Sequence, residues 1–131
     1  IDHRAAHCTS NELFKFVLDD NAIGSFAGRI LVREGSQKTE AYQSNKNLCA
    51  AATAHMYTKP QLEIYADDVK ASHGATTGQL DEAALFYMQQ RCIDRDTAAK
   101  LLLCAFFDEV LKTLSDTQLQ ENLIEKINRI L

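Results

Sequence analysis

The sequence predicts a stack of short β-strands over residues 1–78, followed by a helical domain of about three helices over residues 79–131. Two changes of pattern support this fold class. Up to about His73 the apolar residues tend to alternate with polar ones, which is the period of a strand. Beyond Gly78 the apolar residues recur every three or four positions, which is the period of a helix. No segment with a helical period lies between the predicted strands.

Alternating apolar side chains define the predicted strands. In the clearest strand Phe26, Ile30 and Val32 share one face, while Arg29 and Arg33 lie on the other. The same alternation marks an earlier and a later strand, at Phe14, Phe16 and Leu18 and at Leu62, Ile64 and Ala66.

Polar clusters that favour turns are expected to separate these strands. The four clusters are residues 19–21, 34–36, 44–47 and 58–60. Short strands that follow one another without crossover helices form either an antiparallel sandwich or a coiled parallel solenoid. The period alone favours neither arrangement.

Each of the three predicted helices begins at a capping residue. Asp81 is predicted to cap the first helix and Asp94 the second, because a carboxylate accepts hydrogen bonds from the first free amides of a helix. Ser115 and Gln118 are predicted to form a capping box for the third helix. The second helix contains an apolar run over residues 101–107, and we expect the strand stack, a second protein or both to cover it.

Composition and motifs exclude several classes of function. A formal net charge of -4 without clustered Lys and Arg argues against nucleic-acid binding. No apolar stretch is long enough for a membrane helix and no signal peptide is visible, so we expect a cytoplasmic protein without a membrane partner. No phosphate-binding loop and no nucleophile elbow are present. We therefore expect a non-enzyme whose partner supplies any use of ATP.

His73 is the candidate metal ligand, because it lies where the strands give way to the helices and a neutral imidazole can bind iron. A hydrogen-bonded structural histidine is the simpler alternative. Asp67 and Asp68 are typical of a solvated turn, but with His73 they would suit a metal-dependent enzyme. A purely structural cap on a solenoid is the second alternative function.

The remaining histidines and cysteines give weaker signals. His3, His7 and Cys8 would share one face if they were helical, yet chain ends are usually poorly ordered. The four cysteines form no C-x-x-C knuckle and are expected to be free thiols.

A known family shares a long motif with this chain. The segment from Lys59 to Gly78 resembles the signature of the SufB/SufD family of iron–sulfur cluster assembly scaffolds, and resembles its SufD branch most closely. The likeness continues through Leu80–Met88 and includes the earlier segments Phe26–Ile30 and Gln37–Ala41. Nearly the whole chain resembles the C-terminal portion of that family.

The resemblance implies a right-handed parallel β-helix followed by a C-terminal helical domain. It implies a non-catalytic scaffold subunit that pairs with a SufB-like paralogue through the end of the β-helix and docks a SufC-like ATPase on its helices. An iron–sulfur cluster would form transiently at the interface, at His73, and this chain alone would bind no cofactor. The candidate residues for ATPase docking are Leu85, Phe86, Tyr87 and Phe106.

The sequence does not decide two further points, self-association and the use of a flavin cofactor. An exposed end of a strand stack makes a homodimer plausible through edge-to-edge pairing. Participation of a flavin is undecided, because no local phosphate or ring site is visible.

The chain departs from the family at two positions. Ala71 stands where many members have a cysteine, and alanine cannot bind iron. Cys92 stands where glycine is usual at the end of the first helix. A left-handed backbone there would cost a cysteine roughly 1 kcal/mol.

Overall fold

The computed structural model describes residues 1–130, which fall into two compact units, Ile1–Gly78 and a second that begins at Gln79. The first unit contains six strands: β1 (Asp2–His3), β2 (Thr9–Leu18), β3 (Ile23–Val32), β4 (Thr39–Cys49), β5 (His55–Ile64) and β6 (Val69–Gln79). The second unit contains three helices: α1 (Glu82–Gln89), α2 (Arg95–Leu111) and α3 (Thr117–Ile130).

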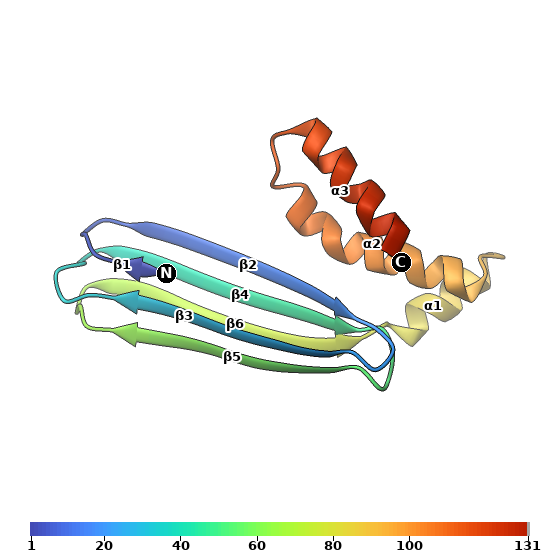
Figure 1. Cartoon of the computed structure of the whole chain (residues 1–131), viewed down its shortest axis with the longest axis horizontal. Helices are drawn as coiled ribbons and strands as arrows, with labels where there is room; N and C mark the ends of the chain where they lie inside the picture. Colours follow the sequence, from blue (N-terminus) through green and yellow to red (C-terminus); the bar gives the residue numbers. More distant parts are fainter. Residues whose placement is uncertain (131) are drawn as a thin grey trace. The chain divides into compact units, whose positions relative to one another are not determined.

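The strands form two three-stranded sheets, in the orders β1-β3-β5 and β2-β4-β6 (Figure 1). Successive strands alternate between the sheets, so the chain returns to the same sheet at every second strand. The pairs β1/β3, β2/β4 and β3/β5 are parallel. This pairing contradicts the antiparallel sandwich that the period had left open.

The core of the strand unit lies on the inward faces of β3 and β4. Ile30 and Val32 of β3 are fully buried and cluster with Ala41 and Ala66, as the alternation predicted. The outward residues Arg29 and Arg33 are exposed, also as predicted, but Ile64, at the end of β5, is 41% exposed although its period places it with Leu62 and Ala66.

The predicted turn over residues 44–47 is wrong, because these residues lie inside β4. Asn45 and Asn47 are buried and face inward. Each carboxamide donates to the other: Asn45 Nδ2 lies 2.9 Å from Asn47 Oδ1, and Asn47 Nδ2 lies 2.8 Å from Asn45 Oδ1. Polar side chains that bond one another inside the unit have the same composition as a turn, and the sequence pattern does not separate the two cases.

The predicted turn over residues 58–60 is also wrong, because it lies inside β5, an edge strand of its sheet. Backbone bonds at the two ends of the β3/β5 pairing are donated by odd-numbered residues. His55 N donates to Ala22 O, just before β3, and Tyr65 N, just after β5, donates to Val32 O. Pro60 has the opposite parity and pairs with Gly28, so its missing N–H belongs to the open side of the strand. A proline at this position costs the sheet no hydrogen bond.

Carboxylates cap all three helices. Asp81 accepts from the amides of Ala83 and Ala84, and Asp94 accepts from that of Thr97, as predicted. The capping box predicted at Ser115 is wrong. Asp116, which directly precedes α3, accepts from Leu119 N at 3.1 Å instead.

The first helix ends in a left-handed residue. Cys92 has a φ of 64°, in the region that favours glycine. Cys92 N donates to Gln89 O at 3.0 Å and Ile93 N donates to Met88 O at 3.2 Å, which is the pattern of a Schellman motif. The strain predicted for Cys92 therefore rests on a conformation that the chain adopts.

Within residues 1–130, no helix has the length and apolar character needed to cross a membrane.

Candidate functional site

His73 lies in β6, an edge strand whose only strand neighbour among the described residues is β4. Val69 and Ala71 of the same strand pack against the core formed by Ile30 and its neighbours. Side chains in a strand alternate between faces, so His73 continues the inward row of Val69 and Ala71. Its side chain is nevertheless exposed, as are those of most of β6. The imidazole is thus on the inner face of the sheet and open to solvent.

Two side-chain contacts define how β6 is aligned with β4. Lys70 Nζ lies 2.9 Å from Glu40 Oε1, and Asn47 Nδ2 lies 3.3 Å from Thr77 Oγ1. The hydrogen bond from Lys70 to the Glu40 carboxylate raises the pKa of Lys70. In both pairs the residues are 30 positions apart. If the same offset holds along the strand, His73 is aligned with Gln43 on the inner face.

Gln43 continues this row onto β2, where it pairs with Glu12. Its Nε2 donates to Glu12 Oε2 at 2.8 Å. Gln43 is only 3% exposed, and its Oε1 is a buried polar atom without a hydrogen-bond partner in the described part of the chain. Glu12 and Gln43 are therefore paired on adjacent strands, and the offset of 30 positions aligns His73 with them on the third strand.

The acidic pair proposed to act with His73 does not meet it. Asp67 and Asp68 are exposed in the turn before β6. Five positions of extended chain place Asp68 and His73 about 16 Å apart, and Asp67 is one position farther away. Residues 1–130 contain no group of three His, Cys, Asp or Glu side chains that could hold a metal ion. The geometry does not support the metal-dependent enzyme.

His3, His7 and Cys8 do not share a helical face, because none of them lies in a helix. His3 lies in β1, and it is buried with its Nε2 2.9 Å from Ser10 Oγ. His7 has a φ of 59° in the turn that follows, and Cys8 directly precedes β2. The three residues therefore do not form one face of a regular element.

The structure separates the candidate docking residues by exposure. Leu85 is fully buried, so it serves the core rather than a partner surface. Phe86 and Tyr87 are 63% and 59% exposed on α1, and the Arg91 guanidinium lies 5.0 Å from the centre of the Tyr87 ring. Phe106 is half-buried on α2, with its ring centre 5.7 Å from that of Phe107.

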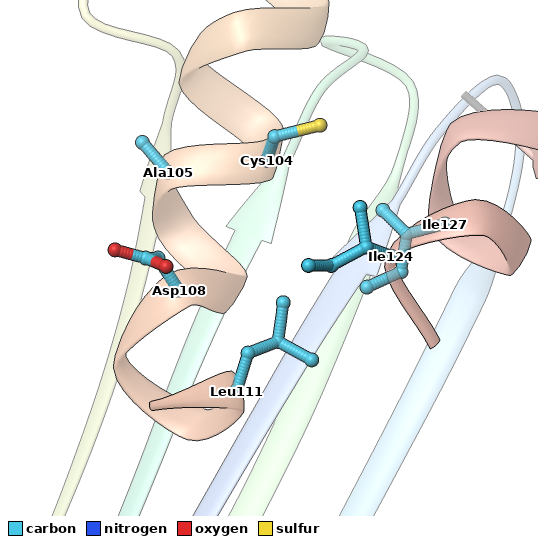
Figure 2. Close-up of a pocket in the computed structure, with 6 residues that line it drawn as sticks. All are labelled: Cys104, Ala105, Asp108, Leu111, Ile124 and Ile127. Atoms are coloured by element: carbon cyan, nitrogen blue, oxygen red, sulfur yellow. The ribbon is translucent and has the colours of Figure 1, made fainter. Parts of the chain in front are cut away.

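A cavity of about 220 Å³ lies between α2 and α3 in the second unit. Figure 2 shows Leu111 of α2 and Ile124 of α3 directed into the gap between the helices. Among the described residues that line it, one is charged, Asp108, which forms an ion pair with Lys112. The cavity therefore presents apolar surface without a convergent set of polar groups.

Sequence reasoning missed Gln43 as a neighbour of His73. The signal that could have found it is the distance between corresponding strands, since partners in β2 and β4 such as Glu12 and Gln43 are 31 positions apart. Polar inward residues in β4 obscured that repeat, because they were interpreted as a turn.

Comparisons with known proteins identify relatives of the whole chain. Residues 1–106 match the family model described as SUF system FeS cluster assembly, SufBD core domain. The iron–sulfur cluster assembly protein SufD of Escherichia coli (strain K12) is 37% identical over 129 residues, which is 98% of this chain. A SufBD family iron–sulfur cluster assembly protein of Synechocystis is 40% identical over 89% of the chain, and one of Mycobacterium leprae is 31% identical over 97%.

The chain spans only part of these relatives. The aligned region is 30% of the Escherichia coli protein, 26% of the Synechocystis protein and 34% of the Mycobacterium leprae protein.

Proposed function

Since the chain belongs to the SufBD core family of the SUF iron–sulfur cluster assembly system, we propose that it is part of a non-catalytic scaffold subunit in the cytoplasm. In this proposal it pairs with a SufB-like paralogue and docks a SufC-like ATPase. An iron–sulfur cluster, which is the cargo rather than a resident cofactor, is assembled transiently at the interface with the paralogue. The observation that carries the proposal is the exposed edge strand β6, with His73 on its inner face.

We propose further that the two sheets belong to a right-handed parallel β-helix. Strands that alternate between two parallel sheets support the β-helix. Its right hand is expected because about 98% of crossover connections between parallel strands are right-handed. An edge strand with an open side can receive a strand of a partner by main-chain hydrogen bonding. Pairing through β6 would bring groups of the paralogue next to His73.

His73 is proposed to bind iron of the growing cluster together with groups of the paralogue. A lone imidazole cannot hold a cluster by itself, and residues 1–130 hold no further ligands grouped together. In this proposal the paralogue supplies the thiolates. One histidine among thiolates raises the potential of a cluster.

Replacing His73 by alanine in the full SUF complex is expected to reduce cluster assembly roughly 10-fold or more, because a ligand to the cluster is removed. Cluster formation is followed by absorbance and by iron content. His55→Ala is the matched control, since His55 is also exposed but lies at the start of β5. Assembly by His73→Ala at the rate of the control would sink the proposal for His73.

ATPase docking is proposed for the exposed face of α1, where Phe86 and Tyr87 lie. Exposed neighbouring aromatic side chains are typical anchors of protein interfaces. We expect the double variant Phe86→Ala/Tyr87→Ala to bind the ATPase roughly 10-fold or more weakly in isothermal titration calorimetry.

The matched control removes two exposed aromatic side chains from the strand unit, Tyr57→Ala/Tyr65→Ala; these residues are 65% and 64% exposed. Circular dichroism checks that both double variants are folded. Equal affinities of the two folded variants for the ATPase would place the docking surface elsewhere.

A further inference from the structure

Glu12, Gln43 and His73 occupy neighbouring inward positions on β2, β4 and β6. We infer that Gln43 is a positioning residue for His73: its Oε1, which has no hydrogen-bond partner among residues 1–130 in this structure, accepts a hydrogen bond from one ring nitrogen of His73 when the exposed imidazole turns toward it, and the other ring nitrogen stays free to bind iron. This inference rests on the proposed function of His73.

Glu12 determines which way the Gln43 carboxamide faces. An ionised carboxylate only accepts hydrogen bonds, so the Gln43 atom 2.8 Å from Glu12 Oε2 must be the donor Nε2. The acceptor Oε1 is then the carboxamide atom left for another neighbour. Because Gln43 Nε2 is bonded to Glu12, the acceptor Oε1, and not the donor Nε2, is available to the next residue of the row formed by Glu12, Gln43 and His73.

The Gln43 side chain is confined in this orientation. It is 3% exposed, and it lies over Gly28 of β3, where an added Cβ would come 2.5 Å from Oε1 and 2.6 Å from Nε2. Gly28 therefore leaves the space that the carboxamide fills. A buried acceptor without a hydrogen bond costs about 1–3 kcal/mol, so a donor is strongly favoured at Oε1.

His73 is the neighbour that can supply this donor. Along β4, the next inward carboxamide, Asn45, is already bonded to Asn47. Across the sheet, the offset of 30 positions puts His73 beside Gln43. Side chains directly opposite on neighbouring strands have Cβ atoms about 5 Å apart, within reach of an imidazole and a carboxamide.

The hydrogen bond would define the chemistry of the imidazole. A neutral histidine has one N–H donor and one nitrogen lone pair, and a bond to the donor selects the tautomer. Metal-binding histidines almost always donate their second ring N–H to such an acceptor, which orients the ring and raises its basicity. Gln43 would supply this contact from within the fold, before any partner binds.

The test uses the full protein labelled with ¹⁵N at histidine, free and in the SUF complex. In the free wild-type protein at neutral pH we expect one His73 tautomer and a ring N–H signal protected from exchange with water. Gln43→Met keeps the length of the side chain but removes the acceptor. We expect this variant to lose the protected signal, to show a mixture of tautomers and to assemble clusters roughly 10-fold more slowly.

Gln61→Met is the matched control, since Gln61 is exposed on β5, and it should leave the His73 signals unchanged. The same His73 nitrogen shifts in wild type and Gln43→Met would overturn the inference. So would the absence of a protected ring N–H in wild type, a measurement that stands even if Gln43→Met does not fold.

The assembly assay separates this inference from the proposed function. If His73→Ala assembles clusters normally while Gln43→Met still changes the His73 tautomer, the hydrogen bond stands and the iron-binding role of His73 fails. If His73→Ala abolishes assembly while Gln43→Met leaves the tautomer unchanged, the role of His73 stands and the positioning by Gln43 fails.

Discussion

Replacing Ile30 by alanine is expected to lower the free energy of unfolding of the strand unit by about 3–4 kcal/mol, because it removes buried methyl and methylene groups and leaves a cavity. Ile30 is fully buried and clusters with Val32, Ala41 and Ala66. Val32 lies on the same strand, whereas the two alanines come from β4 and from the segment after β5. Small neighbours on different segments cannot readily close over the space left by the side chain.

Urea denaturation followed by circular dichroism measures this loss. Ile23→Ala is the matched control, because it is the same substitution in the same strand at a side chain that is 72% exposed. The control should lose well under about 1 kcal/mol. Equal losses for the two variants would contradict the assignment of Ile30 to the core.

Replacing Asn47 by leucine is expected to cost about 3 kcal/mol, although leucine is more apolar and of similar size. The substitution removes both bonds between Asn45 and Asn47 and the bond from Asn47 Nδ2 to Thr76 O at 3.0 Å. The Asn45 carboxamide then remains buried without a partner, and each such polar group costs about 1–3 kcal/mol.

Asn11→Leu, at an exposed position on β2, is the matched control and should be nearly neutral in the same denaturation experiment. The double variant Asn45→Leu/Asn47→Leu should lose less than the sum of the two single variants, since neither carboxamide is then left unpaired. Additive losses would show that the two side chains do not stabilise each other.

The strand β3 shows what the sequence can predict. Its inward residues are apolar and its outward ones polar, so the period of two was enough to assign Phe26, Ile30 and Val32 to the interior, where they are buried. The caps Asp81 and Asp94 were equally predictable, because a carboxylate before a helix has a local and general role.

The strand β4 shows where such reasoning fails. Its interior row is polar at Gln43, Asn45 and Asn47, and these side chains are satisfied largely by partners that folding brings to them. The pattern of apolar residues gives no information about such hydrogen-bond partners. The same limit applies to the site, since His73 was a candidate from its type and place, whereas its neighbour Gln43 lies 30 positions away in the sequence.

Pro60 has a consequence for solubility. Each sheet has an open edge beside its last strand, β5 in one and β6 in the other. Unpaired edge strands template aggregation, and proline is one of the devices that prevent it. In the middle of β5 Pro60 removes an amide from the open side, so another chain cannot add there with a complete ladder. Residues Val69–Gln79 of β6 contain no proline, so a partner bound on β6 would shield the edge that the sequence leaves unprotected.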